Sequence, residues 1–280
     1  MKVGIVGQGF VGSAIREGLS KFHSVMTYDV DHSRSMAVSL SQVVDNSEII
    51  FVCLPTPMKK SGQCDIRILE GSICEINDLA DSSSKNKKVV VIKSTVPPGT
   101  TDMLNEKYQN IKIVFSPEFL TEANSYDDFK NQTRIIIGGD GAKKVKQMFR
   151  KPFPNIPIVV TKANTAEMVK YFINCFLSSK VTFANQMYDV CDQLGIDYDK
   201  VTEYALLDKR IGGSHLAVPG PDGDRGYGGH CFPKDMAAMI YTAKEVGVDT
   251  SLLESVMNSN NKYRKNKDWL DMKGRAVSED

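Results

Sequence analysis

The sequence has almost no net charge. Its 280 residues contain 35 Lys and Arg against 34 Asp and Glu, which gives a formal net charge of +1 at pH 7. Proteins that bind nucleic acid or an anionic membrane through broad electrostatic attraction carry an excess of basic residues. We therefore expect no nucleic-acid partner and no membrane partner, and any ligand has to be recognised locally.

Long apolar runs are also missing. No stretch approaches the ~20 apolar residues that cross a bilayer, and residues 1–6 open directly into a predicted strand without a signal-peptide pattern before them. No internal repeat is present. Because 41% of the residues are hydrophobic, the chain can bury a substantial core. These features predict an ordinary globular protein of the cytoplasm.

Cysteines are few, and they show neither a CxxC pair nor a metal-ligand spacing. They occupy positions 53, 64, 74, 175, 191 and 231. We therefore predict no metal site and no disulfide framework. Free thiols in a reducing cytoplasm are the expectation.

A glycine-rich turn opens the chain. "MKVGIVGQGFVGSAIREGLSKF" places Gly7, Gly9 and Gly12 between an apolar run and residues at helical spacing. In a G-x-G-x-x-G turn the first glycine makes the turn, the second admits a pyrophosphate, and the third lets helix and strand pack closely. A second run, "SVMTYD", ends in Asp29, whose carboxylate would accept from a ribose 2′-OH and repel a 2′-phosphate. The pattern predicts NAD rather than NADP.

Further apolar runs alternate with helical or polar segments: "EIIFVCLP", "KVVVIKSTV", "IKIVFSP", "TRIIIGG" and "IPIVV". This alternation predicts an α/β fold, a Rossmann-like, doubly wound and mostly parallel sheet with helices on both faces. Thr56, Thr95 and Glu118 follow three of these runs, at the strand ends where such sheets bind ligands. Residues of these types also occur there merely as turn formers. We assign residues 1–162 to an NAD-binding domain.

After this domain the sequence predicts one unusually long helix over residues 164–194. Asn164 with Glu167 is a plausible capping pair, and Gly195 is a typical helix end. Six apolar residues form a stripe that fits either the core or a subunit interface: Phe172, Phe176, Phe183, Met187, Cys191 and Leu194.

Lys170 and Asn174 are four residues apart and therefore share one face of this helix. Such a pair is usually solvated surface, and a catalytic pair is the alternative. Residues 163–280 are assigned to the long helix and a small helical domain for dimerisation and substrate binding.

The stretch "DRGYGGHCFPKD" surrounds one cysteine with glycines. Pro233 fits the first turn of a helix that "KDMAAMIYTAKEVG" continues to Gly247. Cys231 then lies just before a helix N-terminus, where the macrodipole and the free N–H groups favour a thiolate. A nucleophile and a buried, inert thiol in a tight turn both fit this position. Residues 261–269 and 273–280 are polar and charged, and we predict disorder there.

Six segments occur together in an order that is similar to one known family. They are "GQGFVG", "KSTVPPGTT", "SPEFLTEA", "EMVKYFINCFL", "DKRIGGSHLAVPGPDGDRGYGGHCFPKD" and "SNN". From residue 1 to about residue 262 the chain resembles the UDP-glucose/GDP-mannose dehydrogenase family. The resemblance implies an NAD-dependent, four-electron oxidation of the C6 alcohol of a nucleotide sugar to a carboxylate. It proceeds through a cysteine-bound thiohemiacetal and thioester.

The resemblance also implies roles for individual residues. Cys231 would be the nucleophile, and Asp235 would orient the groups that form and hydrolyse the thioester. Glu118 and Thr95 would act through water, and Lys170 with Asn174 would hold the C6 oxygen. The implied NAD contacts are Gly7, Gly9, Val11, Gly12, Asp29, Thr56, Thr95, Glu122 and Lys234. The implied substrate contacts are Glu118, Phe119, Leu120, Glu122, Lys170, Asn174, Arg210 and Gly228, with His215 and Asp222 as further candidates.

Three questions stay open at this point. UDP-glucose is favoured over GDP-mannose or a UDP-N-acetylhexosamine as the substrate. Members of the family continue into a second α/β domain that this chain lacks, so it is a short enzyme, a fragment or half of a split enzyme. A homodimer built on the long helix is implied. The alternatives are a two-electron hydroxyacid dehydrogenase, which Cys231 disfavours, and a non-catalytic or partner-dependent NAD-binding subunit.

Overall fold

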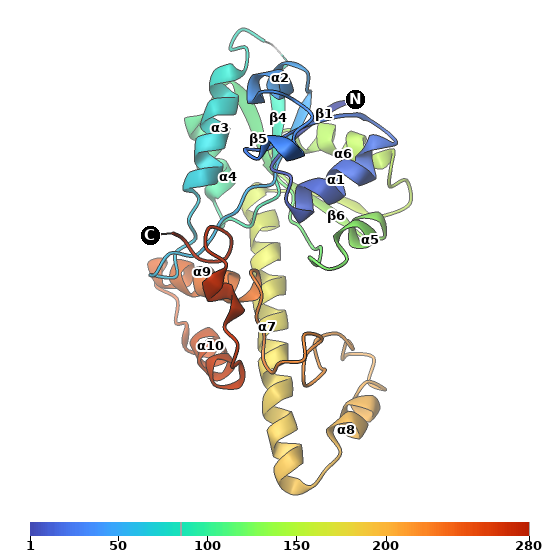
Figure 1. Cartoon of the computed structure of the whole chain (residues 1–280), viewed down its shortest axis with the longest axis vertical. Coiled ribbons are helices and arrows are strands. Elements are labelled where there is room, and N and C mark those ends of the chain that lie inside the picture. Colours follow the sequence, from blue (N-terminus) through green and yellow to red (C-terminus); the bar gives the residue numbers. More distant parts are fainter. Residues whose placement is uncertain (85, 280) are drawn as a thin grey trace. The chain divides into compact units, whose positions relative to one another are not determined.

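The structure, a computed structural model, describes residues 1–84 and 86–279 (Figure 1). The chain forms two compact units. Unit 1 consists of Met1–Thr56 and Ile66–Lys170, and unit 2 consists of Pro57–Asp65 and Tyr171–Asp280. Within the described ranges, none of the helices combines the length and the apolar character that a membrane span requires.

Unit 1 is built on a sheet that has seven strands in the described residues, in the order β2-β1-β3-β4-β5-β6-β7. Neighbouring strands are parallel except β5 and β6, which meet antiparallel where Phe115 pairs with Gly138. The predicted Rossmann-like, mostly parallel sheet is confirmed. The strands are β1 (Lys2–Val6), β2 (Ser24–Tyr28), β3 (Ile49–Val52), β4 (Lys88–Ile92), β5 (Ile111–Phe115), β6 (Ile135–Gly138) and β7 (Ile158–Thr161).

Both faces of the sheet are buried, because successive strand residues point to opposite sides. In β3, Ile49 and Phe51 belong to one core cluster, whereas Ile50 and Val52 belong to the other. This explains why the strands read as continuous apolar runs. One core is covered by α1 (Phe10–Ser20), α5 (Ser125–Lys130) and α6 (Ala142–Arg150), and the other by α2 (Leu40–Asp45), α3 (Arg67–Leu79) and α4 (Thr100–Lys107) (Figure 1).

The long helix α7 (Ala163–Leu194) begins before Asn164, so the predicted capping pair is wrong. Glu167 caps a different helix. Its fully buried carboxylate accepts from the amides of Gly99 (2.6 Å) and Thr101 (2.8 Å) and from the Thr101 hydroxyl (2.6 Å) at the start of α4. The N-cap residue Gly99 has no side chain, so these helix-end groups need an acceptor from elsewhere. The other end of α7 is as predicted, with Gly195 in the left-handed region.

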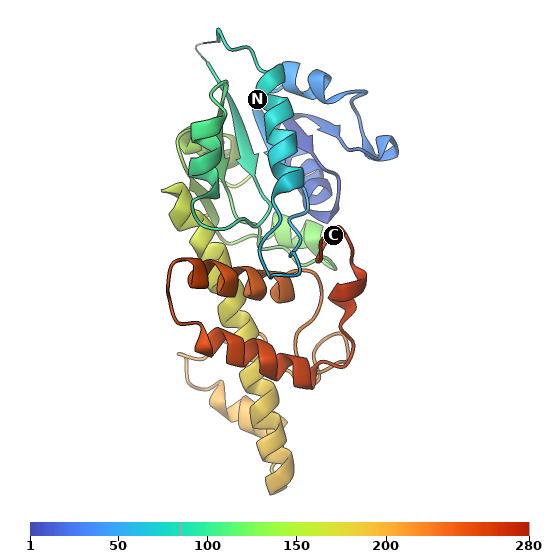
Figure 2. The ribbon, with the colours of Figure 1, turned by 90° about the vertical axis from the view of Figure 1, so that its left-hand side faces the viewer.

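Unit 2 contains the rest of α7 together with α8 (Tyr198–Ala205), α9 (Phe232–Glu245) and α10 (Ser251–Tyr263). α9 and α10 are consecutive and lie side by side (Figure 2). The predicted apolar stripe of α7 divides between two environments. Cys191 packs inward with Ala184, Tyr198 and Val218. Phe172, Phe176, Phe183 and Leu194 are between 61% and 70% exposed.

The C-terminal segment is folded, so the predicted disorder is wrong for the described residues through 279, and residue 280 lies outside them. Arg264, Trp269 and Ala276 are at most 5% exposed. The amide of Met58 donates to the Ala276 carbonyl (2.9 Å), and the Ser278 amide donates to the Met58 carbonyl (2.8 Å). The many charged residues of this segment suggested disorder, but the charge of Arg264 is buried and paired with three carboxylates.

Replacing the carboxylate that caps α4 should destabilise unit 1. We expect Glu167→Ala to lower the free energy of unfolding by about 1–2 kcal/mol, since the helix loses its cap and the amides of Gly99 and Thr101 lose their acceptor. Urea unfolding measures this. Glu106→Ala, at an exposed position in α4, is the matched control. Equal effects of the two substitutions would contradict the assignment.

Candidate active site

The glycines of the turn between β1 and α1 differ in whether a side chain would have room. A Cβ at Gly7, which has φ +90°, would overlap the Cys53 carbonyl, and a Cβ at Gly12 would overlap the Gly7 carbonyl. At Gly9, by contrast, no described atom lies within 4 Å of where a Cβ would be. The turn therefore has open space at the glycine where a dinucleotide fold admits a pyrophosphate.

The surroundings of this turn also fit a dinucleotide. Gly9 is the N-cap of α1 and offers no side-chain cap, so an anion can serve that helix end. Asp29 directly follows β2, and its carboxylate accepts from the amides of Gln8 (2.6 Å) and Asp31 (2.9 Å). Val11 packs against the core below the turn. The residues present fit NAD.

Two threonines tie together the carboxyl ends of neighbouring strands. The hydroxyl of Thr56, after β3, donates to the carbonyl of Thr95, after β4, at 2.7 Å. Both residues are at most 9% exposed. Parallel strands end on the same edge of the sheet, which is why the sequence could place these residues near each other.

The loop after β5 holds a carboxylate that is both hydrogen-bonded and ion-paired. Glu118 accepts from the amides of Phe119 (2.6 Å) and Leu120 (2.9 Å), and its other oxygen pairs with the ammonium of Lys93 at 3.3 Å. Lys93 is 7% exposed and also donates to the Pro117 carbonyl (3.1 Å). Sequence reasoning missed Lys93, although a lysine directly after the apolar run of β4 was a usable signal.

Lys170 belongs to the same cluster in unit 1. It is 8% exposed, its ammonium donates to the Glu118 carbonyl, and it lies 5.5 Å from the centre of the Phe119 ring. Because Lys170 is buried, it is not the solvated surface residue that was one of the two interpretations of the sequence. Glu122, later in the loop, is exposed.

In unit 2, a buried carboxylate lies one turn beyond the candidate nucleophile. Cys231 is the N-cap of α9, and its carbonyl accepts from the Asp235 amide at 3.0 Å. Asp235 is 1% exposed, and its two oxygens accept from the Lys234 ammonium and the Asn174 side-chain amide, both at 2.6 Å. The structure thus brings Asn174, Lys234 and Asp235 into one network.

The charge of Lys234 is maintained despite its burial. Burial alone would lower its pKa, but the neighbouring Asp235, Cys231 and Cys64 raise the pKa of Lys234 above its ordinary value. The ammonium form is therefore the relevant one at neutral pH. A cation near Cys231 favours its thiolate, the form in which a cysteine is nucleophilic.

The remaining candidates lie on the segment between α8 and α9. Arg210 is exposed, and its guanidinium pairs with Asp208. The ring of His215 lies 5.7 Å from that of Phe232, the residue after Cys231. Burial lowers the pKa of His215, so its imidazole is neutral at pH 7. Asp222 pairs with Arg264 at 2.5 Å.

Two other thiols are unsuited to nucleophilic chemistry. Burial raises the pKa of Cys53 to about 12, with Glu118 adding to the shift and Lys93 opposing it. Burial and the charge of Asp235 raise the pKa of Cys175 to about 12. At pH 8 only about one molecule in 10,000 carries either thiolate.

We therefore expect iodoacetamide at pH 8 to modify Cys231 while Cys53 and Cys175 stay unmodified in the folded protein. Peptide mass spectrometry over a time course measures this. The same reagent in urea should modify all three cysteines. Modification of Cys53 or Cys175 as fast as Cys231 in the folded protein would contradict the prediction.

The chain is similar to known proteins over most of its length. The protein is 32% identical over 244 residues to UDP-glucose 6-dehydrogenase TuaD of Bacillus subtilis (strain 168), which covers 84% of this chain and 51% of that protein. It is 30% identical over 308 residues to UDP-glucose 6-dehydrogenase of Rhizobium meliloti (strain 1021), covering 95% and 68%. The solved structure of a UDP-glucose dehydrogenase from Pyrobaculum islandicum matches with a TM-score of 0.82 at 29% identity, covering 93% and 68%.

The chain spans about half the length of the first of these relatives. Residues 34–153 match the NAD binding domain of the UDP-glucose/GDP-mannose dehydrogenase family, and residues 164–262 match its central domain. The chain belongs to the UDP-glucose/GDP-mannose dehydrogenase family.

Proposed function

We propose that the chain is an NAD-dependent UDP-glucose 6-dehydrogenase, which oxidises the C6 alcohol of UDP-glucose to the carboxylate of UDP-glucuronate. The observation that carries the proposal is Cys231 at the start of α9, near the Lys234 ammonium and one turn before the buried Asp235. The relatives named UDP-glucose 6-dehydrogenase favour this substrate over GDP-mannose or a UDP-N-acetylhexosamine.

NAD, when bound, accepts one hydride in each of two oxidations. The open space at Gly9, the uncapped start of α1 and the Asp29 carboxylate support its binding at the glycine turn. The residues proposed to hold it are Gly7, Gly9, Val11, Gly12, Asp29, Thr56, Thr95, Glu122 and Lys234.

Cys231 retains the intermediate between the two oxidations. Its thiolate adds to the carbonyl carbon of the C6 aldehyde, a C–S bond forms, and the oxygen takes up a proton to give a thiohemiacetal. The second oxidation removes a hydride from C6 and the proton from its oxygen, leaving a thioester. Water then adds to the thioester carbon and displaces the sulfur, which yields the carboxylate and restores the thiol.

Further residues are proposed to control the charge that develops at the C6 oxygen. Lys170 and Asn174 hold this oxygen, and an ammonium stabilises its alkoxide character. Asp235 orients the Asn174 amide through their 2.6 Å hydrogen bond. Glu118, paired with Lys93, takes a proton from the water that attacks the thioester, and Thr95 holds that water. Phe119, Leu120 and Gly228 contribute further substrate contacts.

The stoichiometry of the reaction tests the proposal. We expect two NADH per UDP-glucose consumed, followed at 340 nm, and little or no product from GDP-mannose. Cys231→Ser should abolish complete turnover because an alkoxide cannot replace the thiolate at neutral pH. Cys74→Ser, a partly exposed thiol in α3, is the matched control.

Two outcomes of this experiment would contradict the proposal. One NADH per sugar, unaffected by Cys231→Ser, would indicate a two-electron dehydrogenase. Absence of NADH with every nucleotide sugar, while NAD still binds, would indicate a non-catalytic or partner-dependent subunit.

We also propose that two chains form a homodimer through α7. Phe172, Phe176, Phe183 and Leu194 are exposed and recur at spacings of four, seven and eleven residues along one face of the helix. The rings of Phe172 and Phe176 stack with their centres 6.4 Å apart. Contiguous apolar surface of this kind is typical of an interface between chains. Arg210, exposed in unit 2, would then reach the nucleotide sugar of the other protomer.

A charge on this face should therefore dissociate the dimer. We expect Phe176→Glu to shift the mass in sedimentation equilibrium from two chains to one, because the interface would have to bury an unpaired carboxylate. Asp192→Lys is the control. Asp192 is exposed about half a turn around α7 from Phe172, on the other side of the helix, so this substitution should leave a dimer. A monomeric unaltered protein would contradict the proposal.

A further inference from the structure

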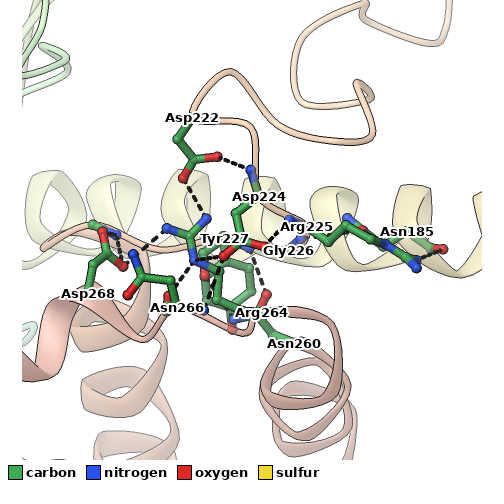
Figure 3. A network of polar contacts seen from close by, with 11 residues as sticks. Asn185, Asp222, Asp224, Arg225, Gly226, Tyr227, Asn260, Arg264, Asn266 and Asp268 are labelled. Atoms are coloured by element: carbon green, nitrogen blue, oxygen red, sulfur yellow. Dashed lines mark hydrogen bonds and ion pairs between the residues drawn. The ribbon is translucent and has the colours of Figure 1, made fainter.

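Side chains from two other segments hold the loop residues shortly before Cys231. The Tyr227 amide donates to the Asn260 side-chain oxygen at 2.7 Å, and the Asn260 side-chain amide donates back to the Tyr227 carbonyl at 2.9 Å (Figure 3). The Gly229 amide donates to the Asp268 carboxylate at 3.1 Å and 3.2 Å. Asn260 lies on α10 and Asp268 lies on η2 (Asp268–Asp271), so the segment after α10 reaches back to this loop.

Arg264 links this segment to the loop by charge. It is 3% exposed, and its guanidinium pairs with Asp222 at 2.5 Å and Asp224 at 3.5 Å on the loop, and with Asp268 at 3.2 Å (Figure 3). Its Nε also donates to the Asn266 carbonyl at 2.7 Å. Without Arg264, three carboxylates would lose the guanidinium that pairs with each of them. Asp268 therefore contacts both the Gly229 amide and the charge of Arg264.

The glycines of the loop are explained by the same side chains. A Cβ at Gly226, which has φ +71°, would lie 2.5 Å from the Asn260 side-chain oxygen. A Cβ at Gly228 would overlap the Arg264 guanidinium and lie 2.5 Å from an Asp268 oxygen. A side chain at either position would displace Asn260, Arg264 or Asp268 from where they lie, so glycine at both positions is compatible with this arrangement.

The other end of the loop is anchored separately. Arg225 donates to the side-chain and main-chain oxygens of Asn185 on α7, both at 3.0 Å, and pairs with Asp189 at 2.7 Å. Its guanidinium lies 4.9 Å from the centre of the Tyr263 ring. This anchor fixes the loop to α7, whereas Asn260, Arg264 and Asp268 fix the glycines next to Cys231.

We infer that Arg264, together with Asn260 and Asp268, is a positioning residue for Cys231. These three residues are called the clamp. Cys231 is two residues beyond Gly229, so release of the Gly229 amide would loosen the backbone that leads into Cys231 and would let the sulfur take up other positions. Displacement of a reacting atom by about 1 Å can cost on the order of 100-fold in rate. The catalytic part of the inference rests on the proposed function, whereas the hold on the loop does not.

The test compares Arg264→Met with Arg264→Lys in the full chain. For Arg264→Met we expect the amide of Gly229, whose acceptor Asp268 pairs with Arg264, to exchange hydrogen about tenfold faster, the change expected for one lost hydrogen bond. We expect kcat to fall on the order of 100-fold with KM changed less than about twofold, because substrate binding is not the clamp's role. Arg264→Lys keeps the charge and should recover part of both losses.

Control variants separate the clamp from general destabilisation. Lys262→Met removes an exposed cation from α10 and should leave amide exchange and kcat unchanged. If Arg264→Met does not fold, Asp268→Ala supplies the test, since it removes the acceptor of the Gly229 amide and should give the same two losses. Asp268→Asn retains an oxygen at that place and should lose less.

Unchanged amide exchange in a folded Arg264→Met protein would overturn the clamp. Faster exchange with an unchanged kcat would overturn its role in positioning Cys231. If the unaltered protein forms no NADH, the proposed function fails, and the clamp is still judged by amide exchange, which requires no turnover.

Discussion

Burial of charge constrains the segments that carry the candidate site. An ionised group removed from water is costly unless an opposite charge or several hydrogen bonds compensate for it. Lys93 pairs with Glu118 in unit 1, Lys234 pairs with Asp235 in unit 2, and Arg264 pairs with three aspartates. Each pairing fixes the place of a side chain or loop that the proposed chemistry uses.

The three ion pairs differ in the role that we propose for their side chains. Glu118 pairs with the Lys93 ammonium through one oxygen, and its proposed role is to take a proton from water. Asp235 accepts from Asn174 and Lys234 through its two oxygens, and its proposed role is to orient these two side chains. Arg264 pairs with Asp222, Asp224 and Asp268. The effect on Cys231 that we infer for it passes through the backbone of the glycine loop.

Most of the fold was predictable from the sequence, because most strands of the described sheet are apolar runs, several of these runs end in turn-forming residues, and the glycine turn follows the first of them. The places of candidate residues were predictable where they follow strand ends or belong to the cysteine motif: Thr56 and Thr95 come after β3 and β4, and Cys231 lies at the start of α9. Prediction failed where a side chain acts on a distant segment. Glu167 suggested a cap for its own helix but caps α4, and the charged residues around Arg264 suggested disorder although long-range aspartates pair with it.

The central claim is that Cys231 carries the intermediate as a covalent adduct. The most direct measurement is mass spectrometry of the peptide that contains Cys231, after the protein has been mixed with NAD and UDP-glucose and quenched in acid within the first turnover. We predict that the peptide containing Cys231 gains the mass of the hexuronyl thioester or of its nucleotide-linked form. The corresponding peptide of Cys231→Ser should gain no such mass. Formation of UDP-glucuronate by the unaltered protein with no adduct on Cys231, or by Cys231→Ser at an undiminished rate, would contradict it.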